Sequence, residues 1–134
     1  MQNLCKIMRT INAVIIKDKK LLVVKKNDYW ILPGGKLESS EMDKECLIRE
    51  IEEELPGTKL IIKDYYKTFE GITPNSKKPL ESKCYFCEIK GEIGNPAHEI
   101  ISKSFVNSSC INKYLFSKTT EKIIFDLFDG GFIA

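Results

Sequence analysis

The stretch "REIEEEL", residues 49–55, places four glutamates in five positions directly behind a single arginine. On a helix, residues three or four positions apart are neighbours, so Glu50, Glu53 and Glu54 would share one acidic edge. Like charges in that arrangement oppose helix formation by roughly 0.2–0.5 kcal/mol per pair. Within the stretch itself only Arg49 is available to neutralise them. A further source of positive charge is therefore needed at this acidic edge, and its nature would indicate the function of the chain.

The helix that carries the acidic edge is predicted for about Glu41–Leu55. Leu47 and Ile51 recur with the final leucine every four positions, which is typical of one apolar helix face. Ser40 with Asp43 resembles a capping box at the start, and a Pro-Gly pair ends the helix. When the apolar face packs on a sheet, the acidic edge should lie at the rim of the core.

The rest of the chain predicts a mixed sheet. Five segments rich in apolar and β-branched or aromatic residues are predicted strands: Thr10–Ile16, Leu21–Lys25, Lys59–Phe69, Lys83–Ile89 and Ile100–Val106. Residues 27–40 carry a proline, two glycines and two serines and are predicted to be a loop. A second helix is predicted over Thr119–Phe128. Strands before and after a central helix, with a helix last, predict a mixed β-sheet covered on both faces.

Composition limits the class of protein. The 134 residues are 43% hydrophobic and 30% charged, without repeats, which predicts one globular domain. A net charge of +2 is too small to predict binding to nucleic acid or to a membrane surface. No run approaches the ~18 apolar residues of a membrane-spanning helix. The segment "MQNLCKIMRT" lacks the apolar core of a signal peptide, so we expect a cytoplasmic protein.

Five cysteines without an export signal are expected to be reduced thiols. Cys84 and Cys87 have the spacing of half a zinc site. They lie in the alternating run "KCYFCEIK", however, and residues three apart in a strand point to opposite faces of a sheet. We therefore interpret them as structural residues.

The acidic edge could be an ordinary solvated face, the usual reading of a Glu-rich helix. Two details favour a bound cation instead. Arg49 is the only basic residue inside the acidic segment, and Gly34 and Gly35 allow the preceding loop to turn a carbonyl oxygen inward. Carboxylate and carbonyl oxygens suit Mg²⁺ or Mn²⁺, and Mg²⁺ commonly takes further ligands from substrate phosphates. The "GGK" segment is not a phosphate-binding P-loop, because Trp30 and Leu37 stand where that motif needs Gly and Ser or Thr.

The spacing of these residues resembles the Nudix box of the MutT-like Nudix hydrolases. Gly35 is followed after five residues by Glu41, and after seven more by residues 49–54, all at the offsets of that motif. The segment "WILPGGKLE" is also similar to the family, and weaker likeness covers roughly residues 10–128. One position departs from the family pattern, since Pro56 replaces a glycine and Gly57 follows one residue late.

This resemblance implies a Nudix-type α/β/α sandwich with a mixed β-sheet between helices, formed by residues 1–134 as one domain, with the box at about residues 35–57. It implies hydrolysis of a nucleoside diphosphate linked to another group, with Mg²⁺ or Mn²⁺. Glu50, Glu53 and Glu54 would ligate the metal with the carbonyl of Gly34. Arg49 would hold a glutamate of the box by a charge-assisted hydrogen bond.

A carboxylate must accept a proton from the attacking water, and the resemblance leaves two candidates. Glu53 is the first, and Glu99 from a later loop is the second. The neighbouring His98 is the only histidine, and we expect it to be an inert surface residue.

Substrate recognition is expected outside the box. Lys36, Lys26 and Lys25 could meet phosphates as point charges. The resemblance implies that Glu41 lies near the metal site through its loop. Stacking on a base could come from aromatic residues that also have a packing explanation, namely Tyr29, Trp30, Tyr65, Tyr66 and Phe69. The polar loop at residues 71–82 is where specificity is expected to vary.

The sequence thus predicts an enzyme that acts on a small-molecule nucleotide, with a nucleoside triphosphate, converted to monophosphate and pyrophosphate, as the first candidate. The alternatives are a nucleotide-sugar or dinucleoside-polyphosphate hydrolase, a non-catalytic Nudix-like nucleotide-binding module, and a structural cation site. No nucleic acid or membrane partner is expected. The sequence leaves the substrate, the metal and the oligomeric state open, a homodimer included.

Overall fold

The computed structural model describes residues 6–73 and 76–134. In chain order its elements are β1 (Met8–Lys17), β2 (Lys20–Lys26), β3 (Tyr29–Ile31), β4 (Gly34–Lys36), α1 (Asp43–Glu54), β5 (Lys59–Ile72), β6 (Pro79–Lys90), β7 (Ile100–Val106), a short 3₁₀ helix (Ile111–Lys113) and α2 (Lys118–Asp129).

Strand β1 is the hub of a seven-stranded mixed sheet. Its end forms a hairpin with β2, its first half pairs antiparallel with β4, and along its other edge it pairs parallel with β6. Beyond β6 lies antiparallel β5, and β2 carries both β3 and β7. The parallel β1–β6 pairing brings together strands that are far apart in the sequence.

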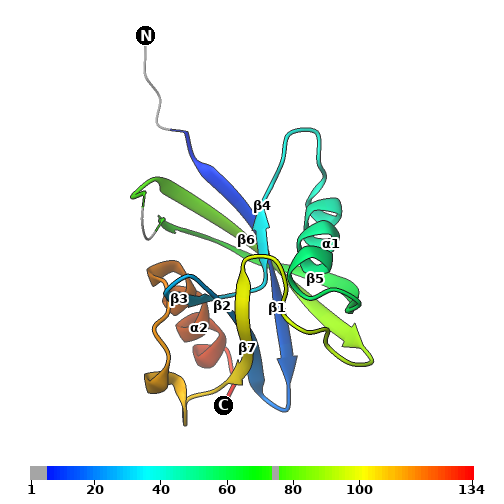
Figure 1. Ribbon diagram of the computed structural model, residues 1–134. Helices are drawn as coiled ribbons and strands as arrows, with labels where there is room; N and C mark the ends of the chain where they lie inside the picture. Colours follow the sequence, from blue (N-terminus) through cyan, green and yellow to red (C-terminus); the bar gives the residue numbers. More distant parts are fainter. Residues whose placement is uncertain (1–5, 74–75) are drawn as a thin grey trace.

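The two helices cover opposite faces of this sheet (Figure 1). Alternation along β1 divides the core, because neighbouring residues of a strand point to opposite faces. Ile11 and Ala13 pack in one buried cluster with Leu47 and Ile51 of α1. Val14 packs in a second buried cluster with Ile123, Ile124 and Leu127 of α2. The expected α/β/α sandwich with a mixed sheet is therefore confirmed.

The five predicted strands and the second helix are present, most of them longer than expected. Residues 27–40 are not all loop, because β3 and β4 form there by pairing with the edges of β2 and β1. The specificity loop expected at residues 71–82 is also shorter, since β5 and β6 extend into it, and residues 74–75 lie outside the described part.

The predicted capping box at the start of α1 is wrong. Ser40 has a left-handed backbone, with φ +70°, and lies before the helix, which begins at Asp43. Glu45 takes the capping role instead, because the backbone N–H of Met42 donates to its Oε1 over 2.9 Å. The boundary therefore lies two residues later than the predicted one at Glu41.

The cysteine pair behaves as expected. Cys84 is buried in the cluster under α2 and Cys87 in the cluster under α1, so the two thiols lie on opposite faces of β6. Cys46, Cys84, Cys87 and Cys110 are free thiols, and Cys5 lies outside the described residues. No helix in the described part is long and apolar enough to cross a membrane.

Candidate active site

Two glycines bring β4 against both β1 and α1. Gly34 has φ +132°, and a Cβ there would lie 2.1 Å from the carbonyl oxygen of Ile11. A Cβ at Gly35 would lie 2.4 Å from the carboxylate of Glu50. Neither position has room for a side chain, so the loop before α1 passes directly beside the acidic edge.

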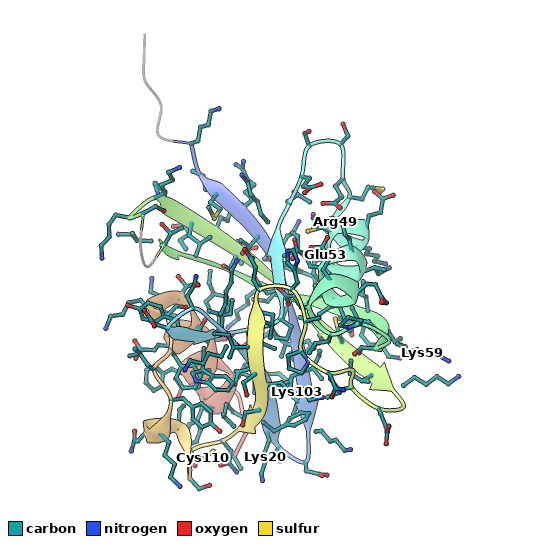
Figure 2. The ribbon with its side chains drawn as sticks, in the orientation of Figure 1. Lys20, Arg49, Glu53, Lys59, Lys103 and Cys110 are labelled. Atoms are coloured by element: carbon teal, nitrogen blue, oxygen red, sulfur yellow. The ribbon has the colours of Figure 1, made fainter. Side chains whose placement is uncertain are left out.

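Arg49 organises the carboxylates around it. Its Nε and Nη2 donate to both oxygens of Glu41, at 2.6 and 3.0 Å, in a bidentate pair. Its Nη1 donates to Glu50 at 2.9 Å and to Glu53 at 3.2 Å. Figure 2 shows Arg49 and Glu53 next to each other on the side of α1 that faces β4. One guanidinium therefore holds three carboxylates in place, and Nη2 also donates to the carbonyl of Lys36.

The contacts and burial around Arg49 shift the pKa values of the neighbouring carboxyl groups in opposite directions. Hydrogen bonds from Arg49 lower the pKa of Glu41 from 4.5 to about 2. The hydrogen bond to Glu41 in turn raises the pKa of Arg49 above its already high value. Burial raises the pKa of Glu50 despite its contact with Arg49. The acidic edge is thus only partly neutralised by its one arginine.

Glu54 is the most unusual carboxyl of the site. Its side chain is buried, with a relative exposure of 6%, and its Oε1 accepts a hydrogen bond from the backbone N–H of Gly34 at 3.0 Å. Burial raises its pKa from 4.5 to about 8, and the nearby charges of Glu50 and Glu53 contribute in the same direction. Without a cation, the ionised form of this carboxyl is disfavoured at neutral pH.

The donor set fits a hard divalent cation, since all of its side-chain ligands would be oxygens. Glu54 supplies the physical reason, because a buried carboxylate is stabilised by an adjacent positive ion. Within residues 6–73 and 76–134, however, no three carboxylate, His or Cys side chains converge closely enough to hold a metal. Arg49 engages Glu50 and Glu53, while Gly34 engages Glu54 through its N–H.

The turn that replaces the family glycine leaves the carboxylates in place. Helix α1 ends at Glu54, and Leu55 caps it by donating its N–H to the carbonyl of Ile51 at 2.8 Å. Gly57, with φ +84°, then makes the left-handed turn one residue after Pro56. Pro56 therefore delays the turn without shortening the helix before Glu54.

The second candidate base lies on a loop that is fastened to α1. The backbone N–H of Ala97 donates to the carbonyl of Glu54 at 2.9 Å. Glu99 forms an ion pair with Lys26 at 3.0 Å, and this hydrogen bond lowers the pKa of Glu99. The charge of Lys26 also opposes the rise that burial causes in the pKa values of Glu50 and Glu54, so Lys26 lies near these acids as well as near Glu99. His98 is exposed.

A cleft of about 430 Å³ runs from Gly34 and Gly35, which lie beside the acidic edge, to the start of α2. The end of the cleft near the acidic edge, the candidate catalytic end, is bordered by Gly34, Gly35, Lys36 and Lys26. The other lining residues are mostly polar or aliphatic: Met8, Thr10, Asn12, Asn27, Tyr29, Ile31, Leu32, Thr73, Ser76, Leu80, Ser82, Ser117, Thr119, Thr120 and Ile123. Of the aromatic residues considered for stacking, Tyr29 lies here, whereas Trp30, Tyr66 and Phe69 pack in the core.

Sequence reasoning missed the polar lining of this cleft. Thr10 and Asn12 lie on the face of β1 that continues into the buried Val14, and Ser82 occupies the matching position on β6. The available signal was the presence of uncharged polar residues in strand positions whose neighbours on the same face are apolar. Such residues are out of place in a core and indicate a cavity.

Comparison with known proteins adds independent information. A family model described as the NUDIX domain matches residues 6–121. A curated relative, the Uncharacterized Nudix hydrolase YvcI of Bacillus subtilis (strain 168), is 40% identical over 50 residues, which are 36% of this chain. The match spans 32% of that relative, about a third of its length.

Solved structures agree. A nudix hydrolase family member from Chromobacterium violaceum is 30% identical, with a TM-score of 0.68, over 92% of this chain and 78% of that chain. A UDP-X diphosphatase has a TM-score of 0.73 at 21% identity over 97% of this chain and 66% of that chain, a likeness of fold alone. Since the matched residues 6–121 include α1 with its acidic edge, the chain belongs to the Nudix hydrolase family.

Proposed function

We propose that this protein is a divalent-cation-dependent pyrophosphohydrolase of nucleoside diphosphates linked to another group. The observation that carries the proposal is the buried Glu54 beside the Arg49-bound carboxylates, at the catalytic end of a cleft of about 430 Å³. A cluster of acids that is short of positive charge attracts a divalent ion, and this ion can bind phosphate oxygens in turn.

Glu50, Glu53 and Glu54, with the carbonyl of Gly34, would hold Mg²⁺ or Mn²⁺. The ion, when bound, lowers the pKa of a coordinated water and neutralises charge on the phosphates. The chain supplies the remaining parts. Arg49 fixes the carboxylates by its hydrogen bonds, so they need little reorganisation during the reaction.

Glu53 is the first candidate to accept the proton of the attacking water. Its side chain is 41% exposed, in contrast to 15% for Glu50, so water can reach it. Glu99 is the alternative base, from the loop fastened to the end of α1. Lys26 and Lys36 border the catalytic end and would bind phosphate oxygens as point charges.

The proposed reaction converts a nucleoside triphosphate into a monophosphate and pyrophosphate. The cleft has the volume of a small-molecule site, and its inner part would take the nucleoside. A second candidate is cleavage of a nucleotide sugar, since fold neighbours are described as a UDP-X diphosphatase and as an ADP-ribose pyrophosphatase. A screen of triphosphates, nucleotide sugars and dinucleoside polyphosphates with Mg²⁺ and Mn²⁺ separates these classes.

The test of the site is Glu53→Gln. Turnover should fall by orders of magnitude while the melting temperature stays unchanged, and Glu52→Gln on the same helix is the matched control. An equal fall for Glu99→Gln alone would instead identify Glu99 as the base. Unchanged turnover in Glu53→Gln would rule out the first assignment.

Two rivals make different predictions. A binding module would bind nucleotides without releasing phosphate or pyrophosphate. A structural cation site would melt when a chelator removes the metal, whereas the proposed enzyme stays folded and becomes inactive.

A further inference from the structure

A row of uncharged polar side chains forms the floor of the cleft next to its catalytic end. Thr10 and Asn12 are two residues apart on β1 and therefore project from the same face. Ser82 lies directly opposite Thr10 in the parallel pairing with β6. Further along, the same face is apolar, with Val14 and Cys84 buried in the core. The polar row therefore ends where the cleft ends.

The side chains of this row are joined by hydrogen bonds in one chain. The Thr10 hydroxyl lies 2.8 Å from Asn12 Oδ1 and 3.0 Å from the Ser82 hydroxyl. On its other side, Asn12 Nδ2 lies 3.5 Å from the backbone carbonyl of Leu32. A carbonyl oxygen only accepts hydrogen bonds, so the atom that faces Leu32 must be the nitrogen of the amide.

This orientation fixes every proton in the row. With its nitrogen toward Leu32, Asn12 presents its oxygen to Thr10, and Thr10 must donate its single hydroxyl proton to that oxygen. Ser82 must then donate to Thr10, because the proton of Thr10 is already used. What remains for a ligand is the second hydrogen on Asn12 Nδ2, a donor whose direction is set by its neighbours.

We propose that Asn12 selects the substrate by donating a hydrogen bond from Nδ2 to an uncharged acceptor on it, a carbonyl oxygen of the kind found on a heterocyclic base. Thr10 and Ser82 are positioning residues that hold the amide in this orientation. The inference rests on the proposed function and identifies the part of the substrate that the cleft distinguishes.

The charges of the cleft support an uncharged ligand group at this place. Among the described residues that line it, only Lys26 and Lys36 are charged, and both border the catalytic end. An anionic group on the floor would find neutral donors only and would lie near the acidic edge. Phosphates are therefore expected at the lysines, and the neutral part of the substrate along the row.

The position of Asn12 connects this contact to the reaction. Asn12 pairs with Gly34 in the β1–β4 register, and Gly34 donates its backbone N–H to Glu54. A Cβ at Gly34 would lie 3.1 Å from Asn12 Nδ2, so the glycine leaves the space in which the amide lies. Gly34 therefore links Asn12 to the carboxylates of the proposed active site. A substrate whose base does not match Asn12 should place its phosphates in the wrong position relative to these carboxylates.

The test compares substrates that differ by exchange of a keto for an amino group, inosine with adenosine triphosphate and uridine with cytidine triphosphate. Wild type should prefer the keto member, because Nδ2 donates to an acceptor and opposes a donor. Asn12→Asp replaces the donor by an acceptor and should move the ratio of kcat/KM toward the amino member by about tenfold or more. Ratios that stay unchanged in this variant would overturn the proposal.

The positioning role is tested by Thr10→Val, which removes the hydroxyl but keeps the shape. The keto preference should weaken and Thr10→Ser should restore it, since serine can make both hydrogen bonds. Thr68→Val is the matched control, because the hydroxyl of Thr68 bonds only to the exposed Tyr65. A loss of preference in the control equal to that in Thr10→Val would contradict the positioning role.

A binding measurement separates failure of this inference from failure of the proposed function. In metal-free protein, guanosine monophosphate or uridine monophosphate should shift the side-chain NH₂ resonances of Asn12 in a ¹⁵N spectrum, and Asn12→Asp abolishes the signal. An Asn12 signal that no nucleotide shifts overturns the inference. Absence of any hydrolysis overturns the proposed function, while the shift still decides the role of Asn12.

Discussion

Replacement of Glu54 by glutamine should make the metal-free protein more stable at neutral pH. The side chain is 6% exposed, and its pKa rises from 4.5 to about 8 on folding. Between these two pH values the folded protein keeps a proton that the unfolded chain releases, so the free energy of unfolding falls as pH rises. With about 1.4 kcal/mol per pH unit, the loss reaches roughly 3 kcal/mol at pH 7.

Glutamine has no charge to bury and can still accept the N–H of Gly34 through its amide oxygen. The assay is urea unfolding with a chelator present, at intervals between pH 5 and pH 8.5. The difference in unfolding free energy between Glu54→Gln and wild type should grow with pH and level off near pH 8. Burial also raises the pKa of Glu50, but it does so in both proteins, so its effect cancels when their unfolding free energies are subtracted.

With magnesium present, wild type should become more stable than Glu54→Gln. In wild type the ion replaces the proton of Glu54, so stabilisation by Mg²⁺ should increase with pH, whereas Glu54→Gln should gain little. Glu88→Gln, at an exposed carboxyl on β6, is the control and should follow wild type in both series. Parallel pH profiles for Glu54→Gln and wild type without metal would refute the claim that a buried, uncompensated carboxyl lies at the centre of the site.

Two other substitutions test single contacts in the site and in the fold. Arg49→Lys keeps the charge but loses the bidentate pair with Glu41. The kcat should therefore fall by about ten- to a hundredfold, with little change in melting temperature. A kcat equal to that of wild type would argue against a site organised by the guanidinium group. Gly71→Ala would place a Cβ 2.1 Å from the buried Oγ1 of Thr119. Urea unfolding should show a loss of stability of about 1–3 kcal/mol. The same loss in a Thr119→Ala background would show that this contact is not the cause.

Much of the fold follows from periodicity in the sequence. Leu47 and Ile51, spaced by four, predict the buried face of α1. Alternation in the run that holds Cys84 and Cys87 predicts that the two thiols lie on opposite faces of the sheet. The error at Ser40 has a local cause. A serine three residues before an acid has the pattern of a cap, but Ser40 has a left-handed backbone in a turn before the helix, and Glu45 caps the helix.

The candidate site could be predicted only in part. The glutamates of the acidic edge come from one helix, so their proximity follows from local spacing. The hydrogen-bonded row of Thr10, Asn12 and Ser82 depends on the parallel register between β1 and β6, which alternation does not determine, since many registers bury the same faces. The direction of the hydrogen bonds in this row also depends on Leu32. The carbonyl of Leu32 approaches Asn12 only because β3 and β4 form within an expected loop.

The parallel pairing of β1 with β6 also has a consequence for how the chain acquires its structure. Thr10 and Ser82 are neighbours across a separation of 72 positions. The hairpin of β1 and β2 can close as soon as it is synthesised, but the opposite edge of β1 must wait until β6 has emerged. Such long-range contacts slow folding. We therefore expect a slow final step in which β6 docks, and a nascent intermediate whose unpaired β1 edge is the point most prone to aggregate.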